Sequence, residues 1–154
     1  MDMPKPTDAH KKLELLVGTW EGEEIMHPSP WAPEGNKAAG KVVNRLALDG
    51  FNVVQEYEQR TQGKLTFSGH GVFEWNPKES CYIMSWWDTF GGVGSRFKGQ
   101  FENKVLTVTN AGEMGHSRAM FDMREPGVYA FKMDMSQDGK TWATVMEGRY
   151  SKKS

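Results

Sequence analysis

Two polar side chains stand where general acid–base chemistry is conceivable. Asp88 follows a pair of tryptophans and precedes a glycine-containing turn, and His70 lies between two glycines in a β-type run. A carboxylate or an imidazole placed inside a pocket can serve as a general base. Each also has a plain structural alternative, because Asp88 can cap its turn and His70 can be a hydrogen-bonded surface residue. They are the two weak candidates for catalytic residues, and whether the protein is an enzyme stays open.

Motifs for metal binding and for nucleophilic catalysis are missing from the sequence. It contains no Cys-x-x-Cys, no His-x-His and no His-Glu-x-x-His, so we predict no metal site. It contains no Gly-x-Ser-x-Gly, and its single cysteine, Cys81, has no basic neighbour in sequence.

Several other residues are candidates for binding a small molecule. Arg118 would bind a carboxylate or phosphate head group if it faced inward, and would form a surface ion pair if it faced outward. Alternation along its strand does not decide between the two. Tyr57 is a candidate for a buried hydroxyl. The candidate apolar wall consists of Met84, Trp86, Phe97, Phe131 and Met133.

Composition limits the kind of protein. A chain of 154 residues with a net charge of −1 fits one domain over residues 1–154, with residues 1–6 expected to be a disordered tail. The sequence has no basic stripe, so we do not expect nucleic-acid binding. It also has no apolar run that would predict a membrane span or a secretory signal. A single cysteine leaves no mark of oxidative folding. The expected location is the cytoplasm.

The order of turn residues predicts an all-β fold. A short helix is expected over Thr7–Leu16, followed by about ten β-type runs separated by Gly, Pro, Asn and Asp. The runs are 17–26, 40–48, 51–60, 65–75, 81–87, 94–101, 105–110, 116–124, 128–136 and 141–151. Asp49-Gly50 is a strong hairpin signal. Ten antiparallel strands avoid sticky edges by closing into a barrel, and a barrel of that size is expected to keep a cavity.

Alternation within the runs predicts which residues face that cavity. Tyr129, Phe131, Met133 and Met135 share one face of their strand. The run 81–87 is apolar on both faces, which predicts that its outer face is covered by the N-terminal helix or by a second subunit. A homodimer is therefore one expected partnership.

The start of the first strand resembles a known superfamily. Leu16-Val17-Gly18-Thr19-Trp20 carries the Gly-x-Trp pattern of calycins, which include lipocalins, fatty-acid-binding proteins and nitrobindins. The resemblance implies that Trp20 plugs the closed end of the barrel. It also implies an arginine from the last strand lying across that ring, for which Arg149 is the candidate.

Four further segments resemble the bacterial DUF1579 proteins: Gly69–Phe73, Tyr82–Asp88, Ser136–Trp142 and Glu147–Tyr150. That family implies a lipocalin-like barrel and carries no agreed active site. Nitrobindins hold haem through one histidine, but no histidine lies in the C-terminal strands here. Haem is therefore a weak alternative, and no cofactor is predicted.

These observations favour one function over the others. The expected function is binding of a small apolar or amphipathic molecule inside the barrel. The candidate ligand-binding residues are Tyr57, His70, Met84, Trp86, Asp88, Phe97, Arg118, Phe131 and Met133. The alternative is an isomerase, cyclase or hydrolase that uses the same cavity on an apolar substrate.

Overall fold

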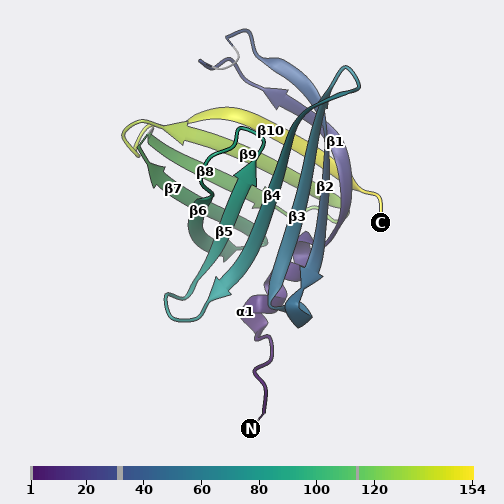
Figure 1. The fold of residues 1–154 in the computed structure, drawn as a ribbon, viewed down its shortest axis with the longest axis vertical. Coiled ribbons are helices and arrows are strands. Elements are labelled where there is room, and N and C mark those ends of the chain that lie inside the picture. The colour runs from purple at the N-terminus through teal and green to yellow at the C-terminus, as the bar shows by residue number, and fades with distance from the viewer. Residues whose placement is uncertain (1, 31–32, 114) are drawn as a thin grey trace.

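Short alternating runs of apolar and polar residues pair in sequence order until the chain closes on itself. The computed structural model describes residues 2–30, 33–113 and 115–154, and it shows a closed barrel of ten antiparallel strands (Figure 1). The strands are β1 (Gly18–Met26), β2 (Asn36–Ala47), β3 (Asn52–Thr61), β4 (Lys64–Asn76), β5 (Cys81–Asp88), β6 (Ser95–Glu102), β7 (Val105–Gly112), β8 (Gly115–Asp122), β9 (Val128–Ser136) and β10 (Ala143–Lys152). The predicted all-β barrel is confirmed.

The barrel is a simple meander closed by its two terminal strands. Each strand pairs with its neighbours in sequence, and β1 pairs with both β2 and β10. This closure removes the free edges that an open sheet of this size would expose. Every strand can then present one face to a common interior.

Some boundaries differ from the sequence expectation. The strand β2 begins at Asn36, earlier than the expected Gly40, because it pairs with β1 along the whole length of that strand. The expected helix splits into α1 (Asp8–Lys11) and the 3₁₀-helix η1 (Lys12–Leu16). The expected tight hairpin at Asp49-Gly50 is a 3₁₀ turn, η2 (Leu48–Gly50), in which Asp49 has a φ of 54°. The tail preceding α1 has no regular structure over residues 2–6, and Met1 lies outside the described residues.

The N-terminal helices close one end of the barrel (Figure 1). Leu13 and Leu16 are 1% and 0% exposed and belong to the hydrophobic core. The indole Nε1 of Trp20 donates a hydrogen bond of 3.0 Å to the backbone oxygen of Leu16. The hydroxyl of Tyr82 on β5 donates to the backbone oxygen of Ala9 at 2.6 Å. Trp20 is therefore buried beneath the helices, at the closed end.

The expected partner of Trp20 is wrong. Arg149 lies on the outer face of β10, mostly exposed, and pairs with Glu125. Residues alternate along a strand, so the neighbours of the inward-facing Tyr150 must point outward. Lys152, which is in register with Trp20, places its Nζ 5.6 Å from the centroid of the indole instead.

The N-terminal helices do not cover the outer face of β5, contrary to one of the two expectations. They sit at the barrel end, where η1 contacts β3 and α1 contacts β4. On the outer face, Ile83 is 1% exposed between the cross-strand neighbours Glu74 and Lys98, whereas Trp87 is 45% exposed. A second subunit over this face stays a prediction.

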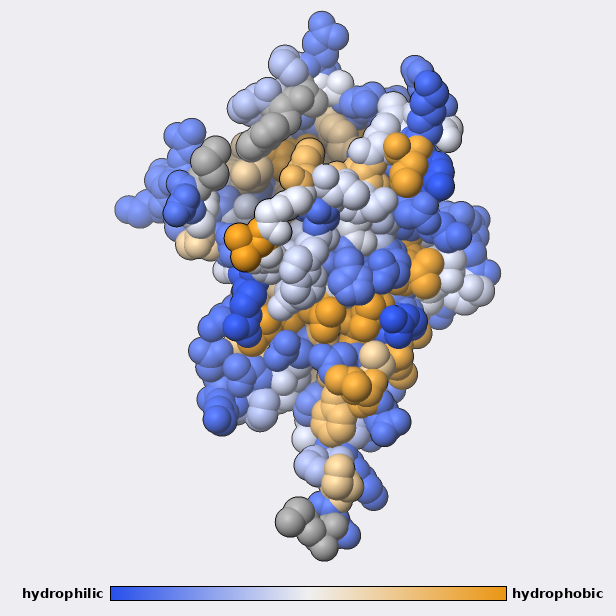
Figure 2. Space-filling view, viewed as in Figure 1, coloured by the Kyte–Doolittle hydropathy of each residue, from blue (hydrophilic) through white to orange (hydrophobic). Residues whose placement is uncertain are grey.

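The face of the molecule seen in Figure 2 is largely hydrophilic, with small groups of hydrophobic side chains distributed over it. Within the described part of the chain, no helix has the length and apolar character needed to cross a membrane.

Candidate functional site

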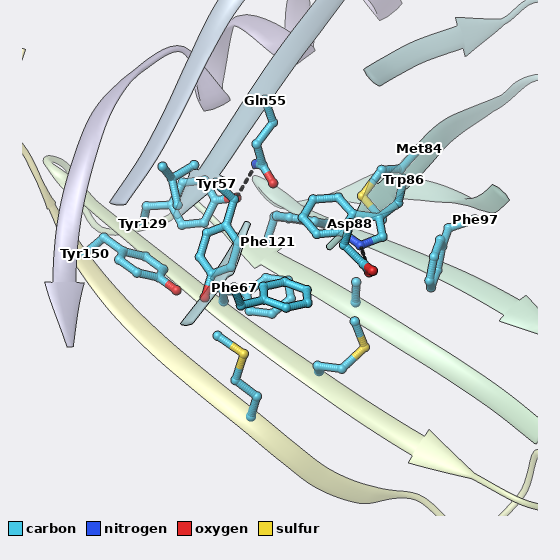
Figure 3. A pocket seen from close by; sticks show the side chains of 15 residues that line it. Gln55, Tyr57, Phe67, Met84, Trp86, Asp88, Phe97, Phe121, Tyr129 and Tyr150 are labelled. Atoms are coloured by element: carbon cyan, nitrogen blue, oxygen red, sulfur yellow. Dashed lines mark hydrogen bonds between the residues drawn. The ribbon is translucent and has the colours of Figure 1, made fainter. Parts of the chain in front are cut away.

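An internal cavity of about 220 Å³ lies above the packed core (Figure 3). Leu106, Val108 and Phe73 fill the barrel toward its closed end and are at most 1% exposed. Farther from the helices the wall residues no longer meet, as expected for a barrel of this width. A cavity of about 150 Å³ holds benzene in an engineered case, so this one has room for a substituted ring.

The lining is mainly aromatic and sulfur-containing. Seven of the nine residues that we expected to contact a ligand line it: Tyr57, Met84, Trp86, Asp88, Phe97, Phe131 and Met133. The other lining residues are Val42, Gln55, Phe67, Ala119, Phe121, Tyr129, Met146 and Tyr150. None of the fifteen is a lysine, an arginine or a histidine. Rings and thioethers provide an adaptable apolar surface, and the few polar groups must provide any orientation.

Gln55 on β3 is a buried polar residue of the lining. Its Nε2 donates to Asn44 Oδ1 at 3.0 Å and to the Tyr129 hydroxyl at 3.2 Å. Asn44 in turn donates through Nδ2 to the backbone oxygen of Leu16 at 2.9 Å, which fixes its Oδ1 as an acceptor. The chain of bonds therefore fixes the amide of Gln55 as well. Both of its hydrogens are used within the protein.

The amide oxygen of Gln55 has no partner in the protein. Every interaction of this residue is accounted for by its nitrogen, and no buried side-chain oxygen or nitrogen is sealed off without a hydrogen bond in the described part of the chain. Since Gln55 is only 4% exposed and lines the cavity, its Oε1 opens onto that space. Figure 3 shows the side chain extending from β3 toward the ring of Trp86. This oxygen is therefore available to accept a hydrogen bond from a bound molecule.

A carboxylate that the sequence analysis missed lies behind two of the lining tyrosines. Glu24 on β1 is 0% exposed. The Tyr57 hydroxyl donates to its two oxygens at 2.8 and 2.7 Å, and the Tyr150 hydroxyl donates to Oε2 at 2.5 Å. The Nε2 of Gln59 donates to Oε1 at 3.1 Å and also to the oxygen of Tyr57. Three donors thus converge on one buried acid.

Burial dominates the acid–base behaviour of this group. It raises the pKa of Glu24, although the hydrogen bonds from Tyr150, Tyr57 and Gln59 oppose the shift. Burial and the neighbouring Glu24 raise the pKa values of Tyr57 and Tyr150 far above the ordinary value for a phenol. Both tyrosines therefore keep their protons and act as donors to the acid. Neither is suited to be a general base.

Two glycines make room for this cluster. A Cβ on Gly40 of β2 would lie 2.2 Å from Oε2 of Glu24, and one on Gly148 of β10 would lie 2.2 Å from the hydroxyl of Tyr150. Both distances are far below van der Waals contact. The acid and the tyrosine can meet only because the two neighbouring strands carry no side chain at these positions.

The mouth of the cavity lies where β5 ends. The Nε1 of Trp86 donates to Oδ2 of Asp88 at 2.8 Å, and the backbone NH of Phe90 donates to Oδ1 at 3.0 Å. Asp88 therefore caps its turn and also lines the cavity. The ring of Phe90 lies 5.1 Å from that of Phe67 but is 85% exposed, so this end of the cavity reaches the surface. Val93, in the same loop, is 97% exposed.

Of the two alternatives for His70, the structure agrees with the hydrogen-bonded surface residue and not with a position in the cavity. Its Nδ1 lies 2.6 Å from Oε1 of Glu56 on the outer face of β4 and β3, and nearly half of its side chain is exposed. The two flanking glycines serve the opposite face, where a Cβ on Gly69 would lie 2.2 Å from the ring of Trp86. The glycines give space to the tryptophan, and the histidine between them points away.

Arg118 also lies outside the cavity. Its Nη2 and Nε donate to Oδ2 of Asp134 at 2.7 and 3.2 Å, and its guanidinium carbon stacks 4.2 Å above the ring of Trp142. The inward-facing residues of β8 are Ala119 and Phe121, so alternation sends Arg118 outward. It does not supply the cavity with a cation.

The other histidines also lie away from the lining. His10 accepts a hydrogen bond at Nδ1 from the backbone of Thr7, His27 lies 2.7 Å from Glu147, and His116 lies next to Trp142. A haem held by a histidine inside this cavity would have no ligand among these residues. The fit between the cavity and that cofactor is therefore poor.

Glu24 and Gln55 were both detectable in principle. Glu24 shares a strand face with the buried Trp20, because the two are four residues apart on one strand. Gln55 shares a face with Tyr57, which the sequence analysis identified. Both residues are polar, and a polar residue in a strand is more often at the surface.

Comparisons with known proteins agree on the fold. The crystal structure of Rv2717c from M. tuberculosis is similar with a TM-score of 0.72 at 12% identity, covering 96% of this chain and 99% of that one. The S-type phycobiliprotein lyase CPES from Guillardia theta is similar with a TM-score of 0.62 at 10% identity, covering 97% and 99%. At these identities the likeness concerns the fold alone. No curated protein sequence matches the chain. A family described as "Protein of unknown function (DUF1579)" matches residues 5–152, and the chain belongs to that family.

Proposed function

We propose that the protein binds a small apolar or amphipathic molecule inside the barrel. The observation that carries this proposal is the cavity of about 220 Å³, lined by rings and thioethers around a few buried polar groups. Ligand sites in proteins commonly combine an apolar wall with a small number of placed polar groups. The similar barrel of a phycobiliprotein lyase is compatible with a ligand in the interior.

Binding is supported better than catalysis. Glu24 is fully enclosed by its donors and has no open side for a reacting atom. Asp88 already accepts bonds from Trp86 and from the backbone of Phe90. A general base needs to reach the proton that it removes. The hydrogen-bond donors around these two acids are instead committed to holding them in place.

Native mass spectrometry of the purified protein tests the proposal, together with thermal melting in the presence of toluene. We expect either a retained small molecule or a toluene-dependent rise in the melting temperature. Ala119→Met should abolish both effects, because Ala119 lines the cavity and a longer side chain would fill it. Thr109→Met, on the exposed face of the adjacent strand β7, is the matched control and should behave like the wild type. A wild-type protein that neither retains nor binds any small molecule would refute the proposal.

A further inference from the structure

The polar atoms that the cavity offers to a ligand are almost all acceptors. The hydrogens of Gln55 go to Asn44 and Tyr129, and the indole hydrogen of Trp86 goes to Asp88. Those of Tyr57 and Tyr150 go to Glu24. Among the lining residues, only the Tyr129 hydroxyl keeps a proton without an assigned acceptor. What remains open is the amide oxygen of Gln55 and the remaining acceptor capacity of the Asp88 carboxylate.

The two carboxyl groups at the cavity have no basic partner among its lining residues. Asp88 lines the mouth, and Glu24 lies one hydrogen bond behind the wall. No lysine, arginine or histidine is among the lining residues, and Arg118, the one inward candidate, is on the outer face with Asp134. A ligand carboxylate or phosphate would therefore be desolvated beside acceptors and beside acids. That arrangement opposes anion binding both by charge and by hydrogen bonding.

We infer that the ligand is a ring-sized apolar molecule whose polar head donates hydrogen bonds, best a primary amine and next an alcohol, and that anionic amphiphiles such as carboxylates are excluded. The inference rests on the proposed function and specifies the chemistry of its ligand. The head would donate to the open Oε1 of Gln55 or to Asp88 at the mouth. The ring would lie against Trp86, Phe131 and Met133.

The test is a set of four probes that share one ring: 2-phenylethylamine, 2-phenylethanol, phenylacetate and toluene. Binding is followed by NMR, using the side-chain amide signals of Gln55 and the indole NH of Trp86. We expect the amine and the alcohol to bind more tightly than toluene, and phenylacetate to bind at least about tenfold more weakly than the amine, a factor that corresponds to about 1.4 kcal/mol. Phenylacetate binding as tightly as 2-phenylethylamine would overturn the inference.

Toluene separates this inference from the proposed function. If toluene binds and the other three probes bind with the same affinity as toluene, the inference about the head group is wrong. The proposal that the cavity binds a small molecule is then retained. If none of the four probes binds, including toluene, the proposed function fails and the inference fails with it.

Two variants test which residues produce the preference for a hydrogen-bond-donating head group. Gln55→Met removes the open acceptor and should reduce the preference for the alcohol over toluene. Gln55→Met also leaves Asn44 and Tyr129 without the Gln55 partner. Asp88→Asn therefore provides a second test, which keeps these two bonds and gives up one of the two bonds from Trp86 and Phe90. Asp88→Asn should lower the affinity for the amine several-fold and leave that for toluene unchanged. Glu56→Gln, which removes a negative charge from the outer face next to Gln55, is the control and should change neither. An unchanged amine affinity in Asp88→Asn would contradict the assignment.

Discussion

The hydroxyl of Tyr150 and the carboxylate of Glu24, 126 residues apart in the chain, meet at 2.5 Å inside the barrel. They come from the last and the first strand, whose pairing closes the fold. The contact therefore joins the closure of the barrel to the polar side of the cavity. Its consequences can be measured as stability and as the pH dependence of stability.

Replacing Glu24 should change how stability depends on pH. Because burial raises the pKa of Glu24, the folded state holds its proton more tightly than the unfolded chain does. The stability that this group contributes is therefore greatest below the unfolded value of 4.5 and falls as the pH rises through the folded pKa. Glu24→Gln cannot titrate, so the stability of the wild type relative to this variant should decrease as the pH rises.

Urea unfolding at a series of values from about pH 4.5 to about pH 8 measures this difference. Glu23→Gln, on the exposed face of the same strand, should keep the slope of the wild type. Parallel stability curves for the wild type and Glu24→Gln would contradict the prediction.

Adding a methyl group at Gly40 should disrupt the acid–tyrosine contact. The new Cβ would lie 2.2 Å from Oε2 of Glu24 and 2.8 Å from Cε1 of Tyr150, so one of the two must move. We expect Gly40→Ala to reduce the free energy of unfolding by about 1–3 kcal/mol, the usual cost of overpacking. Gly112→Ala is a matched control on β7, where the nearest atom is 3.5 Å away. Denaturant unfolding of both variants tests this, and equal stabilities would argue against a tight fit.

A graded pair of substitutions should move Trp86. A Cβ on Gly69 would lie 2.2 Å from the Trp86 ring, whereas one on Gly71 would lie 3.2 Å from it. Gly69→Ala should displace the indole, break its bond to Asp88 and shift the indole NH signal of Trp86. Gly71→Ala should do so less. A wild-type indole signal in Gly69→Ala would show that the ring is not held where the structure places it.

The ion pair between Arg118 and Asp134 should matter for stability and not for binding. The Asp134 side chain is 2% exposed and accepts bonds from Arg118 and Thr144. Burial acts to raise the pKa of Asp134, but these hydrogen bonds and the nearby Lys132 and Arg118 charges outweigh it, so the pKa is lowered. The stability from this group is therefore present above the unfolded value of 3.8 and is lost as the pH falls through the folded pKa.

We expect Arg118→Met to cost about 1–3 kcal/mol at neutral pH, because it leaves a buried acid without its main donor. Arg124→Met removes an exposed pair with Asp122 and should cost less than about 1 kcal/mol. Neither variant should alter the affinity for the phenyl probes. A loss of binding in Arg118→Met would contradict the outward position of Arg118 and would favour the alternative in which it binds the ligand.

The sequence indicated most of the fold and the apolar part of the site. Turn residues and alternation were sufficient for ten strands, and they placed Phe131 and Met133 on the inner face correctly. The polar part was less predictable. Alternation along β4 places His70 opposite Phe67 and Phe73, and it therefore favours the outward position that the structure shows. Arg118 shares its strand face with both Met120 and Asp122, so the pattern of β8 alone does not decide its direction.

Glu24 was missed for a different reason. Its burial depends on two glycines, Gly40 and Gly148, and on two tyrosines, all on other strands. No single run of sequence contains that arrangement.

The N-terminal helices and Trp20 block one end of the barrel, and the ladder of strands leaves no gap along its wall. The loop that carries Phe90 and Val93 follows β5 at the opposite end of the barrel. Under the proposed function, a change in this loop that alters no contact with the bound molecule should change the rates of capture and release by the same factor. The equilibrium between the occupied and the empty barrel would then depend on the lining residues.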